Sequence, residues 1–259
     1  MLFDLSTYIG HWPFRKIEIS TLDELSCELS DNLTDCAAVT NLNSVFYRDC
    51  MEGNIELTES LGSYVGRVEF YPCAVINPIY IEWKTDLKKC AELGFKGVEI
   101  APGYHKYAAD CPSARELYRL CGELGLVFKV AAGFENIRGR NVFDTFYEPT
   151  GEQLFNLISS SEKTSTVICG YYNYDLGDAL RAEATRRDNV LFDISCLDDF
   201  NNGTLSDTVR YVGEKRMCYA STAPFRLIEP QQIKLFSGTL SDEGVSDVAY
   251  KNALRIFNK

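Results

Sequence analysis

Short β-rich runs alternate with amphipathic segments along almost the whole chain, and this alternation restricts the possible folds more than any other feature. Strands are predicted over Leu2–Ser6, Cys36–Thr40, Val68–Ile76, Gly97–Ala101, Val127–Ala131, Thr166–Gly170, Val190–Ile194 and Met217–Ala220. Helices are predicted between them, over Leu22–Leu29, Ile81–Leu93, Ser113–Leu124, Glu152–Ser160, Asp178–Arg187 and Ser206–Gly213. Strands that alternate with helices in this way pair in parallel through right-handed crossovers.

The predicted strands are short and mostly apolar throughout, which is typical of a parallel sheet covered by helices. Eight such units in 259 residues, near the roughly 250 residues of a typical (β/α)8 barrel, predict an α/β fold with a single TIM-barrel domain over 1–259. An open doubly wound sheet remains the alternative, because periodicity does not reveal closure. The longest irregular stretch, Gly133–Pro149, follows the fifth strand, and such long loops usually serve a site or a partner.

Charge and composition narrow the classes of partner. The formal net charge is −11 and no basic run is longer than the two residues of Arg186-Arg187, so a nucleic-acid partner is not expected. The chain has no run of eighteen apolar residues and no basic segment before Asp4, which predicts neither a membrane span nor a signal peptide and favours the cytoplasm. Its ten cysteines form no C-x-x-C pair and are expected to be reduced and mostly buried.

Several segments resemble landmarks of the amidohydrolase superfamily, in the family's order. Phe3–Gly10 resembles the first strand, which in the family reads Asp-x-His-x-His-x-Gly; Gly94–Pro102 resembles the fourth and Gly125–Ala131 the fifth. Ala220–Phe225 is similar to the eighth strand, typically Gly-Ser-Asp-x-Pro, and Asn252–Phe257 to the closing helix. The resemblance covers almost the whole chain and implies an amidohydrolase-like TIM barrel.

A second resemblance is narrower. Gly10-His11-Trp12-Pro13-Phe14-Arg15 is similar to a signature that ends the first strand in a subset of amidohydrolase-like proteins. Tyr104–Tyr107 and Ala223–Phe225 fit the same subset. This resemblance implies a shared barrel and pocket, without a reaction that carries over.

The family's metal-ligand positions are occupied by other residues. They hold Ser6 and Tyr8 in the first strand, Ala131 in the fifth, Cys169 or Gly170 in the sixth, and Thr222 in the eighth. The chain has two histidines, His11 and His105, which are too few for a site built from three or four imidazoles. We therefore expect no metal and no other cofactor, so the family's metal-activated hydroxide is not expected here.

Candidate functional residues follow the strands, because the C-terminal ends of barrel strands carry the site. His105, after the fourth strand, is the first candidate for general acid or base, and a loop-ordering role is the alternative. Glu135 is the second catalytic candidate, against an exposed surface glutamate. His11 and Tyr104 are candidates for binding substrate, although packing of His11 beside Trp12 is slightly favoured.

Strand alternation gives a sharper prediction for two charged residues. If Ala101 and Ala131 face inward, Glu99 and Lys129 also do so, two residues earlier on adjacent strands. Because an isolated buried charge is costly, we expect Glu99 and Lys129 to form an ion pair inside the barrel. The functional alternatives for Lys129 are contact with substrate or a Schiff-base amine, the latter requiring an unpaired lysine with a lowered pKa.

Further candidates lie on the last three strands. Thr222, beside Ser221, offers a hydroxyl at the mouth of the barrel, and Arg226 is a candidate for binding an anionic group, with a surface arginine as the alternative. Asp193 is expected to face inward, either in a structural hydrogen bond or in catalysis. Tyr171, with Tyr172 and Tyr174, would line a ligand pocket or a subunit contact.

Three functions are consistent with these residues. The leading one is a hydrolase or lyase that acts without metal on a small polar or carboxylated molecule. The second is a non-catalytic protein that binds a small ligand, and the third is a hydrolase with an unusual metal held by carboxylates and thiolates. A small-molecule ligand and a homodimer are the expected partners. The chain contains no G-x-S-x-G, Walker or G-x-G-x-x-G motif.

Overall fold

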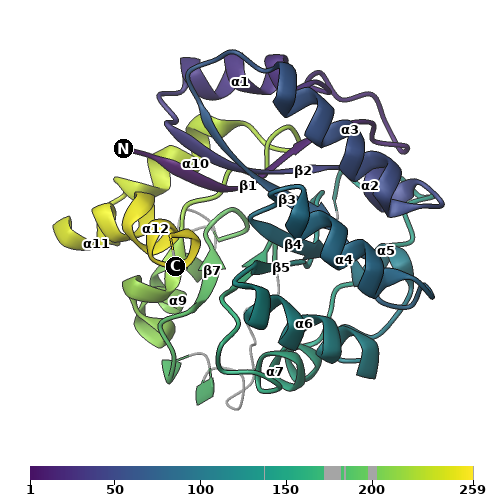
Figure 1. Ribbon diagram of the computed structural model, residues 1–259. Helices are drawn as coiled ribbons and strands as arrows, with labels where there is room; N and C mark the ends of the chain where they lie inside the picture. Colours follow the sequence, from purple (N-terminus) through teal and green to yellow (C-terminus); the bar gives the residue numbers. More distant parts are fainter. Residues whose placement is uncertain (137, 172–181, 184, 198–202, 259) are drawn as a thin grey trace.

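The computed structural model describes residues 1–136, 138–171, 182–183, 185–197 and 203–258, and they form a TIM barrel (Figure 1). Its eight parallel strands are hydrogen-bonded in chain order. They are β1 (Phe3–Ile9), β2 (Cys36–Asn41), β3 (Glu69–Val75), β4 (Gly97–Ile100), β5 (Val127–Ala131), β6 (Thr166–Cys169), β7 (Val190–Asp193) and β8 (Met217–Cys218). Each strand overlaps the range predicted for it.

Helices surround the sheet (Figure 1). The longer ones are α1 (Leu22–Asp31), α3 (Cys50–Ser63), α4 (Trp83–Glu92), α6 (Pro112–Leu124), α7 (Gly151–Ile158), α9 (Thr204–Val212) and α10 (Ile228–Leu235). The short ones are α2 (Asn43–Phe46), α5 (Pro102–His105), η1 (Glu214–Arg216), α11 (Asp242–Ser246), the π-helical η2 (Asp247–Lys251) and α12 (Asn252–Phe257). No helix within the described ranges has both the length and the apolarity needed to cross a membrane.

Local sequence accounts for several helix ends. Thr21 and Thr150 each accept a hydrogen bond in a capping box that begins a helix, α1 and α7 respectively. Gly125 ends α6 in the left-handed conformation that glycine adopts without strain. Half of the predicted helix Asp178–Arg187, residues 178–181 and 184, lies outside the described residues.

The barrel is closed by a seam between β1 and the segment that follows β8. Leu5 N–H donates to the carbonyl of Tyr219 (3.1 Å) and Tyr8 N–H to that of Ala223 (2.9 Å). Thr222 N–H donates in return to the carbonyl of Ser6 (2.9 Å). This seam shows that the open doubly wound sheet, the alternative to a barrel, is wrong.

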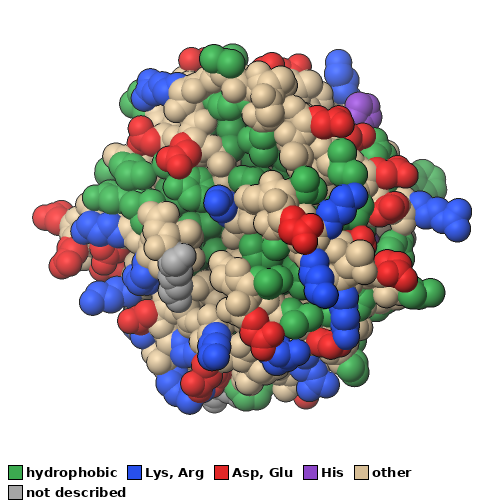
Figure 2. Space-filling model, viewed as in Figure 1, with side chains coloured by type: hydrophobic (Ala, Val, Ile, Leu, Met, Phe, Trp, Pro, Cys, Tyr) green, Lys and Arg blue, Asp and Glu red, His purple; other side chains and the backbone are tan. Residues whose placement is uncertain are grey.

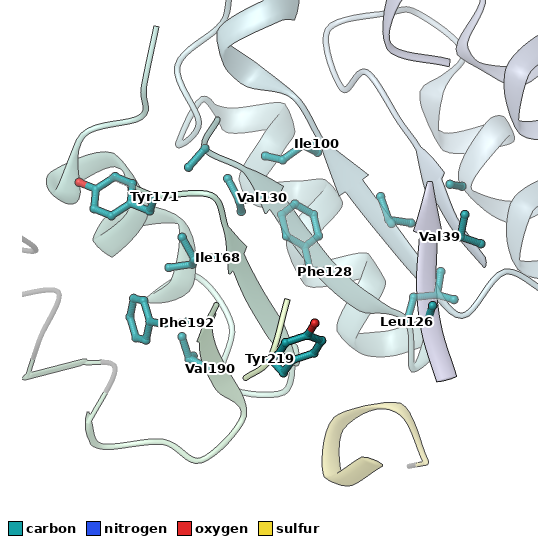
Figure 3. Packing of buried hydrophobic residues seen from close by; sticks show 14 of the residues in the cluster. Val39, Ile100, Leu126, Phe128, Val130, Ile168, Tyr171, Val190, Phe192 and Tyr219 are labelled. Atoms are coloured by element: carbon teal, nitrogen blue, oxygen red, sulfur yellow. The ribbon is translucent and has the colours of Figure 1, made fainter. Parts of the chain in front are cut away.

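Most of the core lies between the strands and the helices. Figure 3 shows this layer with Phe128 and Val130 of β5 beside Ile100 and Ile168 of the flanking strands. The alternate residues of the strands face the barrel interior, where a second cluster packs against Ala253 and Ile256 of α12. The C-terminal helix therefore closes the N-terminal end of the barrel, and the site must lie at the opposite end.

The surface on the side of α10 and α12 is partly apolar. Figure 2 shows apolar side chains gathered at the left of the view, where these helices lie in Figure 1. A groove of about 330 Å3 lies there, between Met1, Leu33, Phe236 and Tyr250. Acidic and basic side chains are intermixed over the rest of this face.

Candidate functional site

An ion pair occupies the middle of the barrel. Glu99 on β4 and Lys129 on β5 lie opposite each other in the sheet register, with Lys129 Nζ 2.8 Å from Glu99 Oε2. Their side chains are 2 % and 0 % exposed. The predicted ion pair is therefore confirmed.

The carboxylate of Glu99 also accepts hydrogen bonds from two hydroxyls. Tyr8 Oη donates to Oε1 (2.9 Å) and Thr40 Oγ1 to Oε2 (2.6 Å). The Tyr8 hydroxyl lies 2.9 Å from Ser6 Oγ, and Lys129 Nζ lies 5.6 Å from the centre of the Tyr8 ring. Both carboxylate oxygens are thus satisfied, as a buried charge requires.

The environment of Lys129 keeps its amine protonated. Burial alone lowers the pKa of Lys129, but the Glu99 carboxylate and the nearby Cys73 and Cys169 thiols raise it by more. A Schiff-base lysine needs an unpaired amine with a lowered pKa. That alternative for Lys129 is wrong, because the amine is paired and its pKa is raised.

The residues at the family's metal-ligand positions do not fit a metal ion. Ser6 and Tyr8 hydrogen-bond to each other, and burial raises the pKa of the Tyr8 phenol well above its usual value, so it stays neutral. Ala131 has no donor atom, and burial raises the pKa of the Cys169 thiol. In the described ranges, no three His, Cys, Asp or Glu side chains are grouped so as to hold a metal.

Two buried aspartates, Asp4 and Asp193, lie near the Glu99–Lys129 ion pair and its hydrogen-bonded hydroxyls. Asp4 Oδ1 accepts the backbone N–H groups of Ser6 (3.1 Å) and Ser221 (3.0 Å), and burial raises its pKa to about 6. Asp193 accepts the hydroxyl of Ser195 (2.8 Å) and the N–H of Gly170 (2.9 Å), and burial raises its pKa too. The hydrogen bonds of Asp193 agree with the structural role among its predicted alternatives.

An aromatic cluster covers the mouth of the barrel above the ion pair. At its centre is Trp12, in the loop after β1, which makes edge contacts with Phe14 of the same loop (5.2 Å between ring centroids) and with four rings from other loops. Its ring centroid lies 4.7 Å from Phe225, 5.4 Å from Phe46, 5.6 Å from Phe134 and 5.7 Å from Tyr104. These rings follow β8, β2, β5 and β4, so the indole lies across the centre of the mouth.

Glu135 holds this aromatic cap in place. It is 5 % exposed, so the prediction of a surface glutamate is wrong. Trp12 Nε1 donates to its Oε2 (3.0 Å), and Arg15 forms an ion pair with its Oε1. Arg15 was not among the predicted site residues, although it ends the Gly10–Arg15 signature.

His105 lies at the end of α5, between two loops. Its Nε2 is 2.9 Å from the carbonyl oxygen of Val45 in α2. Because a carbonyl only accepts, Nε2 carries the hydrogen; burial lowers the pKa of His105, so the ring is neutral. Its Nδ1 lone pair is buried without a hydrogen-bond partner among the described residues.

Three of the residues predicted to bind substrate, Tyr104, His11 and Tyr171, lie in different parts of the structure. The hydroxyl of Tyr104 donates to Asp144 (3.1 Å), which tethers the aromatic cluster to the long loop after β5. His11 is exposed, and its backbone N–H donates to Asn43 Oδ1 (2.8 Å). Tyr171 is buried in the layer between strands and helices (Figure 3), away from the barrel interior. Tyr172 and Tyr174 lie outside the described residues.

Thr222 and Arg226 follow the eighth strand. Thr222 is buried with φ 60°, a left-handed conformation that is rare for a β-branched residue. Arg226 lies with one Nη 3.3 Å from the sulfur of Cys196, in the loop after β7. It also lines a pocket of about 320 Å3 at the rim of the barrel, together with Arg15 and Lys16. Neither Lys16 nor Cys196 was predicted, since only the fold brings these loops together.

No curated protein matches the sequence. Residues 81–259 match the family model described as Amidohydrolase.

Solved structures share the fold at low identity. One is an uncharacterised TIM-barrel protein from Bordetella bronchiseptica, with TM-score 0.74 and 13 % identity over 99 % of this chain and 98 % of that one. The 2,6-dihydroxybenzoate decarboxylase from Rhizobium gives TM-score 0.73 and 13 % identity over 100 % and 99 % of the two chains. A dihydroxybenzoic acid decarboxylase from Polaromonas, with bound manganese and 2-nitroresorcinol, gives 0.74 and 12 % over 99 % and 96 %.

Proposed function

Because the chain belongs to the amidohydrolase family, we propose that it is a member that works without metal, as a hydrolase or lyase acting on a small polar or carboxylated molecule. The observation that carries this proposal is the hydrogen-bonded layer around Glu99 and Lys129. This ion pair and its hydrogen bonds hold polar side chains in fixed positions inside the barrel, where a metal ion and its ligands would do so in metal-dependent members of the family. The Polaromonas relative binds manganese, whereas the donor set of this chain does not fit a metal. The names of the decarboxylase relatives support a carboxylated ligand.

His105 is the proposed general base. Its ring is neutral, with a lone pair on Nδ1 that no described residue occupies, which is the state a base needs near neutral pH. The Val45 carbonyl fixes the tautomer by accepting the Nε2 hydrogen. Glu135 assists by holding Trp12 and Arg15 over the mouth, so that a bound molecule is shielded from water.

The second candidate is a protein that binds a small molecule without turnover. The engagement of Glu135 favours it, because a carboxylate already bonded to Trp12 and Arg15 is poorly placed to act as a base. The two candidates differ in the role of His105.

The proposal is tested by metal content and by a histidine pair. Protein purified without chelator or histidine tag should contain Zn, Fe, Mn and Ni well below one atom per chain; a ratio near one would overturn metal independence. A panel of small amides, lactones and carboxylic acids is then incubated with EDTA-treated protein and followed by mass spectrometry. His105→Gln should abolish any turnover, whereas His11→Gln, at the exposed histidine, should retain it. Binding without turnover by the unmodified protein would favour the second candidate.

A further inference from the structure

Thr222, in the segment that follows β8, combines two unfavourable features. Its φ is 60°, a conformation that is rare for a β-branched residue. The other described non-glycine residues with positive φ, Leu33 and Lys106, are exposed, whereas Thr222 is 1 % exposed. Its Oγ1 is also buried and has no hydrogen-bond partner in the described part of the chain. The folded chain therefore retains, at one residue, a strained backbone and an unsatisfied hydroxyl, each of which lowers its stability.

Backbone hydrogen bonds on both sides hold Thr222 in this conformation. Its N–H donates to the carbonyl of Ser6 (2.9 Å), and its own carbonyl accepts the N–H of Phe225 (2.9 Å). Ser6 belongs to the hydrogen-bonded layer around the ion pair, and the ring of Phe225 belongs to the aromatic cap over the mouth. Thr222 therefore connects the polar layer to the cap, at the end of the barrel where functional residues lie.

We propose that the Thr222 hydroxyl orients the bound small molecule by donating a hydrogen bond to one of its carbonyl or carboxylate oxygens. Strained residues persist where the surrounding structure fixes them, and they gather at ligand sites. An oxygen atom of a bound molecule satisfies the hydroxyl, which is unsatisfied in the free protein. Because α12 closes the opposite end of the barrel, the molecule enters through the mouth, past the aromatic cap. The inference rests on the proposed function, to which it adds a residue that binds the ligand.

Two other buried threonines serve as controls. Thr34 Oγ1 is likewise buried without a partner among the described residues, but Thr34 precedes β2 at the opposite end of the barrel, and its φ is not positive. It is the matched control for an unsatisfied hydroxyl away from the mouth. Thr7 is the control for a satisfied one, because its buried Oγ1 donates to the carbonyl of Ala38 (2.9 Å).

The first experiment measures urea unfolding of the ligand-free protein and of three valine variants, since valine replaces the hydroxyl by a methyl group and keeps the β-branched shape. Thr222→Val and Thr34→Val each remove an unsatisfied hydroxyl and should lower the equilibrium constant for unfolding roughly five- to tenfold. Thr7→Val leaves the Ala38 carbonyl without its donor and should raise the constant by about the same factor. A Thr222→Val protein destabilised as much as Thr7→Val would overturn the proposal, because the hydroxyl would then be bonded within the protein.

The second experiment measures binding by ligand-observed NMR titration. Acetate and acetamide are the probes, because they are among the smallest molecules with a carboxylate or an amide carbonyl. Thr222→Val should weaken the binding of acetate roughly fivefold or more, whereas Thr222→Ser, which keeps the hydroxyl, and Thr34→Val should bind it like the parent protein. Equal affinity of the parent and Thr222→Val, or no binding of either probe at about 50 mM, would overturn the proposal.

The outcomes for Thr222 and for the proposed function are distinguishable. Turnover by metal-free protein that is lost in His105→Gln but kept in Thr222→Val would overturn the role of Thr222 and leave the function. Binding of acetate that depends on the Thr222 hydroxyl, by a protein that contains one metal ion per chain, would overturn metal independence and leave the role of Thr222.

Discussion

Replacing Glu99 by Gln removes the charged partner of the buried Lys129 amine while keeping the shape of the side chain. The two groups are 2.8 Å apart and almost fully buried, with Tyr8 and Thr40 completing the carboxylate. At an effective dielectric constant of about 20, the attraction at this distance is about 6 kcal/mol. Burial of each ion costs several kcal/mol, so the intact pair contributes little net stability.

Removal of one partner has a larger effect than the net value of the pair. It leaves an uncompensated buried charge, which costs about 3–5 kcal/mol. We therefore expect Glu99→Gln to lower the free energy of unfolding by that amount. The double variant Glu99→Gln/Lys129→Met removes both charges and should recover most of the loss, to within about 2 kcal/mol of the parent protein.

The assay is urea unfolding of the parent, both single variants and the double variant, followed by circular dichroism and by fluorescence. Coincident transitions at the two signals are needed before a free energy is taken from a chain of this length. The coupling energy of the cycle should exceed about 2 kcal/mol. A loss below about 1 kcal/mol in Glu99→Gln, or a double variant as unstable as the sum of the single ones, would refute the pairing.

Two further predictions concern glycine and aspartate. Gly170 and Gly125 both have positive φ, but a Cβ at Gly170 would lie 2.0 Å from the carbonyl oxygen of Gly133, whereas Gly125 has open space. Gly125→Ala should cost about 1–2 kcal/mol and Gly170→Ala clearly more, as measured by urea unfolding; equal costs would contradict the close approach. Burial raises the pKa of Asp4 from 3.8 to about 6, so its stabilising contribution is complete below pH 4 and is lost as the pH rises through 6. Between pH 4 and 7 this loss is about 2.5 kcal/mol, and Asp4→Asn should lack it; parallel pH profiles of unfolding would show that Asp4 does not titrate this way.

Periodicity predicted the eight strands and the helices α1, α4, α6, α7 and α9, whereas the number of units and the family resemblance predicted that the sheet closes into a barrel. It missed α3, whose buried face includes Gly53 and Asn54. Asn54 is buried because its amide donates to the carbonyl of Val75 and accepts the N–H of the same residue, both at 2.9 Å. A helix that buries a polar side chain against a strand lacks the apolar stripe by which helices are recognised.

The candidate site was predictable only where strand geometry determined it. The Glu99–Lys129 pair follows from alternation along two neighbouring strands. The partners of Glu135 do not, because Trp12 and Arg15 lie more than a hundred positions earlier in the chain. The register irregularity of β1 between Asp4 and Thr7, which the sequence does not reveal, brings Tyr8 to the ion pair.

The seam between β1 and the segment after β8 has a consequence for biosynthesis. Asp4 and Ser221, which are hydrogen-bonded across it, are 217 positions apart. At about 5–20 residues per second, a ribosome needs roughly 10–40 s to synthesise the intervening chain. Throughout that time the outer edge of β1 has no strand to pair with, and an unpaired edge is a template for other chains. Because this edge is paired only when the segment after β8 has been synthesised, the nascent chain is open to pairing with other chains for most of its synthesis.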